Sequence, residues 1–293
     1  MNNIILKANP KLIRKRIVVK TKPIIIANSQ RPTKNINRQP QPQPIQQTQN
    51  RQLKEVKKTK EPHVQRISRN ISPESIKKIQ NIKGIGTGKD LAIIGNGPSI
   101  SEIPLERIKD KLDIISINHP DERLWPTKFW AFFDTSQINR HEGLWSNYSG
   151  TIFNSTAIKK QKPGTIMFKN ISGQGFSRDL DRGLYVGRSS VYACMQIALW
   201  MDYKNIYLFG VDMNPDGLNG KLHFYGTNPD VKPELRASRF GREAEFYENA
   251  ANVLNKDERE RFTFCSLGIN PWPFIHKFNT IGHIESIDLI LGV

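Results

Sequence analysis

The chain has 293 residues, which is enough for one large domain or two small ones, and its formal net charge at pH 7 is +17. Its two cysteines, Cys194 and Cys265, lie in apolar stretches and form no CxxC pair, which disfavours a zinc site and favours a reducing compartment. No apolar run reaches the roughly 18–20 residues that a membrane span needs, and the N-terminus lacks the apolar core of a secretory signal. We therefore expect a cytoplasmic protein without a membrane span.

The charge divides the chain into a basic arm and a neutral remainder. Residues 1–88 contain 20 Lys and Arg against 3 Asp and Glu, which accounts for the whole net charge. With a Gln/Pro tract over residues 38–49, this arm is expected to be disordered apart from a short helix near 73–82, with Ser72 as N-cap and Pro73 at N1. The positive charge of this arm favours either non-specific binding of nucleic acid or contact with a protein assembly. Its lack of aromatic residues argues against base stacking.

A short buried strand and a glycine-rich turn organise the rest of the chain. Residues 91–94 are four apolar residues in a row, which predicts a strand buried on both faces. The segment 95–99, Gly-Asn-Gly-Pro-Ser, then turns the chain, and Ser99 or Ser101 could cap a helix running through residues 102–110. Free main-chain amides at such a turn, next to a helix N-terminus, form a site for phosphate. The alternative is a tight turn that binds no ligand.

Further strands and helices alternate along residues 89–293. Strands are predicted at 112–118, 129–134, 151–155, 165–168, 205–212 and 262–266, and helices at about 191–201 and 242–255, with a long polar loop over 213–239. This alternation predicts an α/β fold, a Rossmann-like, doubly wound and mostly parallel sheet that begins after residue 88. In such sheets a ligand binds beyond the C-terminal ends of the strands.

Polar residues gather at these strand ends and helix starts, which favours a ligand site there. The turn has only the first two glycines of G-x-G-x-x-G, and the chain has no Gly-Lys-Ser/Thr sequence, so NAD and the usual ATPase chemistry are disfavoured. Arg178, Arg182 and Arg188 lie near the predicted helix start and either neutralise a diphosphate or solvate a loop. The gathered polar residues are Asn96, Ser99, Asn118, Asp134, Ser189, Asp212 and Ser266.

Three of these motifs resemble a known family. The turn 95–99, Asn118 after the second strand, and the segment 189–194 leading into the strand 206–212 are similar to motifs of the bacterial sialyltransferases of the Campylobacter type, glycosyltransferase family 42. They also resemble a broader Rossmann-like group that includes the archaeal hydroxymethylpterin diphosphokinases and uncharacterised members from bacteria and bacteriophages. The similarity covers about residues 90–290, in the order and spacing of the motifs, and the arm lies outside it.

The resemblance implies a nucleotide-dependent transferase that uses a nucleotide-sugar donor of the CMP type. It implies that His223, in the loop after the strand 205–212, is the general base, and that Tyr207, with Tyr225 as a second candidate, stabilises the leaving phosphate. Asn96, Gly97, Asn118 and Ser189 would contact the nucleotide. The full set of nucleotide-binding residues expected on this basis is Gly95, Asn96, Gly97, Pro98, Ser99, Asn118, Asp134, Ser189, Ser190 and Asp212.

Two departures from the family pattern keep other interpretations open. Asp134 stands where the family has a second nucleotide-binding asparagine, and Met213-Asn214 replaces a tyrosine expected after the strand 205–212. One alternative is an ATP-dependent diphosphokinase in which Asp134 and Asp212 hold Mg²⁺. Another is a structural protein that keeps the fold without catalysis and packs through its arm against nucleic acid or within an assembly such as a virion. A bacteriophage-encoded, virion-associated protein would suit that second alternative.

Overall fold

The apolar run of residues 91–94 forms most of strand β1 (Asp90–Ile94), and its side chains alternate between two hydrophobic clusters. Leu91 and Ile93 face one cluster, whereas Ala92 and Ile94 face the other. Both faces of the strand are therefore buried, which explains why the sequence shows a continuous apolar run. In this computed structural model the described residues are 71–226 and 232–293, and they belong to one unit, His63–Val293. The predictions for residues 1–70 of the arm lie outside them.

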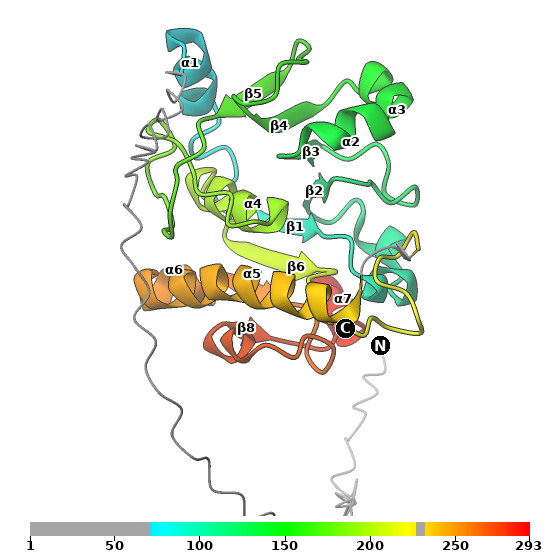
Figure 1. Cartoon of the computed structure of the whole chain (residues 1–293). Coiled ribbons are helices and arrows are strands. Elements are labelled where there is room, and N and C mark those ends of the chain that lie inside the picture. The colour runs from blue at the N-terminus through cyan, green and yellow to red at the C-terminus, as the bar shows by residue number, and fades with distance from the viewer. Residues whose placement is uncertain (1–70, 227–231) are drawn as a thin grey trace, which may run out of the picture. The chain divides into compact units, whose positions relative to one another are not determined.

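Eight strands form one sheet in the order β5-β4-β3-β2-β1-β6-β7-β8, and every neighbouring pair is parallel (Figure 1). The predicted Rossmann-like α/β sheet is thus confirmed. The chain moves outward from β1 to β5 and then returns to add β6 on the other side of β1, so the topological switch lies between β1 and β6. The other strands are β2 (Asp113–Ile117), β3 (Phe129–Ala131), β4 (Thr151–Ser155), β5 (Thr165–Phe168), β6 (Asn205–Phe209), β7 (Phe262–Phe264) and β8 (Asn279–Thr280).

Helices cover both faces of the sheet. The cluster on one face is built with α4 (Ser190–Trp200) and α5 (Pro233–Val253), and the other face is covered by short helices that include α2 (Thr135–Arg140), α3 (Glu142–Asn147) and α7 (Glu285–Leu291). No helix in the described part of the chain is long and apolar enough to cross a membrane. The remaining helices are α1 (Pro73–Asn81), α6 (Lys256–Glu260) and the 3₁₀ helices η1 (Pro98–Glu102), η2 (Leu105–Ile108) and η3 (Pro273–Lys277).

Helix α1 confirms the helix predicted near residues 73–82. Ser72 is its N-cap, accepting a hydrogen bond from the Ser75 amide, and Pro73 is its first residue. The helix packs on the domain: Ile79 is fully buried, and its carbonyl accepts a hydrogen bond of 2.8 Å from Nε1 of Trp200. The packed unit therefore extends N-terminal to residue 88.

Two predicted helices differ from those observed. The α-helix expected after Ser99 is replaced by η1 and η2, because Pro104 holds Ile103 in an extended conformation between them. Helix α5 begins at Pro233, within the segment predicted as a loop, because Pro233 is well placed at a first helical position and Glu234 follows in the first turn. The earlier start lengthens α5 at its N-terminal end.

Candidate functional site

The glycine turn after β1 is hydrogen-bonded to the end of β6. The Gly95 amide donates to the Phe209 carbonyl and the Gly97 amide to the Gly210 carbonyl, each at 2.8 Å, and the Ser99 amide donates to Oδ2 of Asp212 at 2.8 Å. The prediction that these main-chain amides stand free for a phosphate is therefore wrong. These amides form hydrogen bonds because the turn is packed inside the fold, where backbone amides are almost always paired.

The glycines of the turn are required by close packing. A Cβ at Gly95 would lie 2.6 Å from the Gly210 carbonyl oxygen, and one at Gly97 would lie 2.5 Å from the Asp212 carboxylate. Both distances are shorter than any normal contact. The turn thus needs glycine in order to approach β6, whether or not a ligand binds there.

Asp212 has a structural role in the turn. Its side chain is 2 % exposed, and Oδ1 accepts a hydrogen bond of 2.7 Å from the Ser99 hydroxyl while Oδ2 accepts from the Ser99 amide. Burial raises the pKa of Asp212, and the two hydrogen bonds from Ser99 oppose that shift. The Asp134 side chain also accepts a hydrogen bond within the protein: Asp134 is the N-cap of α2, and its Oδ1 accepts from the Ser136 amide at 2.9 Å.

The Mg²⁺ interpretation depends on two carboxylates that each accept a hydrogen bond within the protein. In residues 71–226 and 232–293, no group of three or more His, Cys, Asp or Glu side chains is placed to hold a metal ion. The diphosphokinase alternative requires Asp134 and Asp212 to act together as ligands. Each of them instead accepts hydrogen bonds from its own neighbours.

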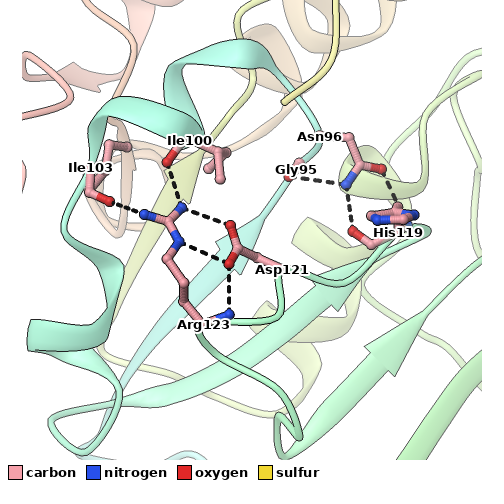
Figure 2. A network of polar contacts seen from close by, with 7 residues as sticks. All are labelled: Gly95, Asn96, Ile100, Ile103, His119, Asp121 and Arg123. Carbon is pink, nitrogen blue, oxygen red and sulfur yellow. Dashed lines mark hydrogen bonds and ion pairs between the residues drawn. The ribbon is translucent and has the colours of Figure 1, made fainter. Parts of the chain in front are cut away.

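A salt-bridged clasp holds η1 in place beside the turn (Figure 2). The guanidinium of Arg123 forms two hydrogen bonds with Asp121, which is 4 % exposed, and also donates to the carbonyls of Ile100 and Ile103, both at 2.7 Å. The guanidinium thereby adds a charged donor to two carbonyl groups at the C-terminal end of η1. The clasp fixes η1 to the loop that follows β2.

Replacing Arg123 with Ala should lower the free energy of unfolding by about 2–4 kcal/mol, because Asp121 would remain buried without its counter-charge. Arg123→Lys should recover only part of this loss, since a single ammonium cannot reach all three partners. Urea denaturation of the three proteins measures the difference. An unchanged midpoint for Arg123→Ala would show that the clasp contributes nothing.

An open cavity of about 1020 Å³ lies at the C-terminal edge of the sheet, beside the switch between β1 and β6. The sheet order brings together most of the residues predicted from the sequence, because parallel strands end at the same edge. Gly95, Pro98, Ser99 and Tyr207 do not line the cavity. The predicted residues that line it are Asn96, Gly97, Asn118, Asp134, Arg188, Ser189, Ser190, Asp212, His223 and Tyr225.

Two asparagines hold the loops around the cavity. Asn96 donates through Nδ2 to the His119 carbonyl at 2.8 Å, so it ties the glycine turn to the end of β2 (Figure 2). Asn118 has a φ of 51°, a left-handed conformation that asparagine tolerates better than most residues, and its Oδ1 accepts from the Ser190 hydroxyl at 3.3 Å. The ends of β1 and β2 and the start of α4 are therefore linked by side-chain amides.

The cavity contains three histidines. His223 stacks on Tyr225 with ring centroids 5.1 Å apart, and His119 lies between Tyr225 and His141, with 3.3 Å between Nδ1 of His119 and Nε2 of His141. Burial lowers the pKa of all three rings, that of His141 to about 4. All three are therefore neutral at pH 7, and a neutral imidazole can accept a proton.

Tyr207 is placed away from this chemistry. It lies within β6, is 7 % exposed and belongs to the cluster on the face that contains η1 and η2. Burial raises its pKa. The role predicted for Tyr207 at a leaving phosphate therefore does not fit its position, whereas Tyr225 is at the cavity.

Arginines surround the cavity, and sequence analysis singled out only one of them, Arg188. Arg178 and Arg182 lie elsewhere and pair with Glu258 and Asp179. The arginines at the cavity are Arg140, Arg188, Arg236 and Arg239. Among the described residues no carboxylate lies within ion-pairing distance of Arg140, Arg188 or Arg239, which leaves three exposed guanidinium groups suited to an anionic ligand.

Comparison with known proteins gives structural similarity only. No family model and no curated protein matches the chain. The sialyltransferase CstII from Campylobacter jejuni, in complex with cytidine-5'-monophosphate, matches with 17% identity and a TM-score of 0.39, covering 64% of this chain and 87% of that one. A second structure of CST-II, with a trisaccharide acceptor and CMP, matches with 16% identity and a TM-score of 0.38, covering 66% and 86%. At this identity no residue role is transferred from them.

Proposed function

We propose that the chain is a nucleotide-dependent transferase, specifically a sialyltransferase-like glycosyltransferase with a nucleotide-sugar donor. The observation that carries this proposal is the cavity at the switch point, where Asn96, Asn118 and Ser190 meet the exposed guanidinium groups of Arg140, Arg188 and Arg239 and a neutral His223. The motif resemblance of the turn 95–99 and the segment 189–194 independently points to the same class. Uncharged amide and hydroxyl side chains can hydrogen-bond to the base and ribose of a nucleotide, and guanidinium groups can bind its phosphate.

The proposed reaction is a direct displacement at the donor sugar. An acceptor hydroxyl attacks the anomeric carbon while the bond from that carbon to the phosphate oxygen breaks, and the phosphate leaves with the electron pair. His223 takes the proton of the attacking hydroxyl. Arg140 and Arg188 stabilise the charge that develops on the leaving phosphate, in place of the predicted Tyr207.

Nucleotide binding can be tested by thermal unfolding. CMP, UDP and ATP are added separately, and we expect CMP to give the largest stabilisation. At 100 times its Kd a ligand adds about 2.7 kcal/mol, which raises the Tm of a protein of this size by about 5–10 °C. Arg140→Gln should reduce the shift, because it removes a cation from the cavity.

The matched control is Arg182→Gln, because Arg182 is exposed and pairs with Asp179 outside the cavity. This variant should keep the full shift with CMP. If no nucleotide stabilises the protein at millimolar concentration, the transferase proposal fails. If both variants respond alike, the nucleotide binds elsewhere.

A further inference from the structure

One face of α5 borders the cavity. Arg236, Arg239, Phe240 and Glu243 stand at positions i, i+3, i+4 and i+7 of the helix and all line the cavity, and Tyr247, four residues after Glu243, continues the row. Glu243 is 8 % exposed and Tyr247 is fully buried. A buried carboxyl group must be either protonated or well paired, so the contacts of Glu243 decide what it does.

Glu243 and Tyr247 meet at Ser189. Glu243 and Ser189 both line the cavity and their side chains interact, and Oγ of Ser189 lies 3.2 Å from Oη of Tyr247. Ser189 is the N-cap of α4, yet its side chain caps no helix amide, although serine at this position usually does so. Its hydroxyl is instead shared between Glu243, Tyr247 and the cavity that Ser189 lines.

Counting hydrogen bonds at Ser189 gives two distinct states. A hydroxyl has one donor and two acceptor positions, and an ionised carboxylate only accepts. When Glu243 is ionised, Ser189 must donate to it, and only a lone pair then faces the cavity. When Glu243 is protonated, it donates to Ser189, and the Ser189 hydroxyl is released to donate to a ligand.

We propose that the phosphate of a nucleotide binds at Ser189 together with one proton, which Glu243 takes up from solvent. This inference rests on the proposed function for the identity of the ligand. Glu243 is a positioning residue, because it acts through the Ser189 hydroxyl. Binding of the anion and protonation of Glu243 favour each other to the same extent, as linkage requires.

The surroundings of Glu243 allow its carboxyl group to change protonation state near pH 7. Burial raises the pKa of Glu243 to about 7, against the opposing effects of the Ser189 hydrogen bond and the positive charge of Arg239. Both protonation states are therefore accessible at pH 7. Of the charged groups, Arg239 acts on Glu243, and Tyr247, which itself lies near Tyr192 and Cys194, follows one turn further along α5. Arg188, Arg236 and His223 line the same cavity.

Isothermal titration of the full chain with CMP between pH 7 and pH 9 tests the proposal. The wild-type protein should lose about tenfold in affinity over this range and take up a proton on binding, seen as a heat that depends on the buffer's ionisation enthalpy. Glu243→Gln keeps a donor for Ser189 and should bind CMP with the same affinity at both pH values. Glu245→Gln, an exposed neighbour on α5, should behave like the wild type.

Ser189→Ala provides a second variant in case Glu243→Gln does not fold. It should bind CMP more weakly and lose the dependence on pH. CMP binding with an identical pH dependence in wild type and Glu243→Gln would overturn the inference and leave the proposed function standing. Absence of binding by CMP, UDP and pyrophosphate would overturn both.

Discussion

Replacing His223 with Gln is expected to lower the rate of sugar transfer by about 100- to 10,000-fold, because the general base is lost. Glutamine keeps a polar side chain of similar size but cannot accept the proton. The measurement is release of CMP from a CMP-sugar in the presence of an acceptor, under conditions where CMP still binds. His276→Gln is the matched control, since His276 lies exposed in η3 and outside the cavity.

The pH dependence of kcat/KM gives a second readout of His223. Its pKa is lowered mainly by burial and further by the charges of Arg239 and Arg140, against a hydrogen bond with the Asn96 backbone. The neutral base is present above the lowered pKa, so the acid limb of kcat/KM should lie below the ordinary histidine range. Arg239→Gln removes a positive charge and should move this acid limb to higher pH. A transfer rate for His223→Gln within threefold of the wild type would rule out the assigned base.

Replacing Asp212 with Ala should cost about 2–4 kcal/mol of unfolding free energy, because the amide and hydroxyl of Ser99 would lose their partners inside the protein. Both groups are buried, and the carboxylate accepts from each of them. Guanidinium or urea denaturation measures the loss. The effect should be accompanied by weaker nucleotide binding, since the turn borders the cavity.

Asp212→Asn separates a structural role from a chemical one. The asparagine can accept from the Ser99 amide through Oδ1 and donate through Nδ2 to the Ser99 hydroxyl, so this variant should lose less than about 1 kcal/mol. It should also keep its transferase activity. A folded Asp212→Asn protein without activity would contradict the structural assignment and point to direct action of Asp212 on a ligand.

The sequence was sufficient to predict the fold, because buried parallel strands leave a strong pattern. Each predicted strand is present, and the helix at Ser190 begins within one residue of the expected position. The two helix predictions that differ from the structure have local causes. Pro104 divides the expected helix into 3₁₀ turns, and the polar start of α5 at Pro233 gives no apolar signal that would distinguish a helix from a loop.

The site was predictable best where residues follow strands or open a helix. Asn96 and Asn118 could be placed at one edge because parallel strands end together. Arg140 is the last residue of α2, and the face of α5 that carries Glu243 depends on where that helix begins. No sequence pattern therefore identifies either residue as part of the site. The pairing of the Ser99 amide with Asp212 joins positions 113 residues apart, which no local pattern reveals.

A crystal structure with CMP tests most directly whether the cavity at the switch between β1 and β6 binds a nucleotide. We expect the nucleotide to lie beside the turn at Asn96 and Gly97 and to contact Asn118 and Ser190, with its phosphate near Arg140 and Arg188. A nucleotide bound on another surface, or an empty cavity in crystals grown at saturating CMP, would contradict the proposed site.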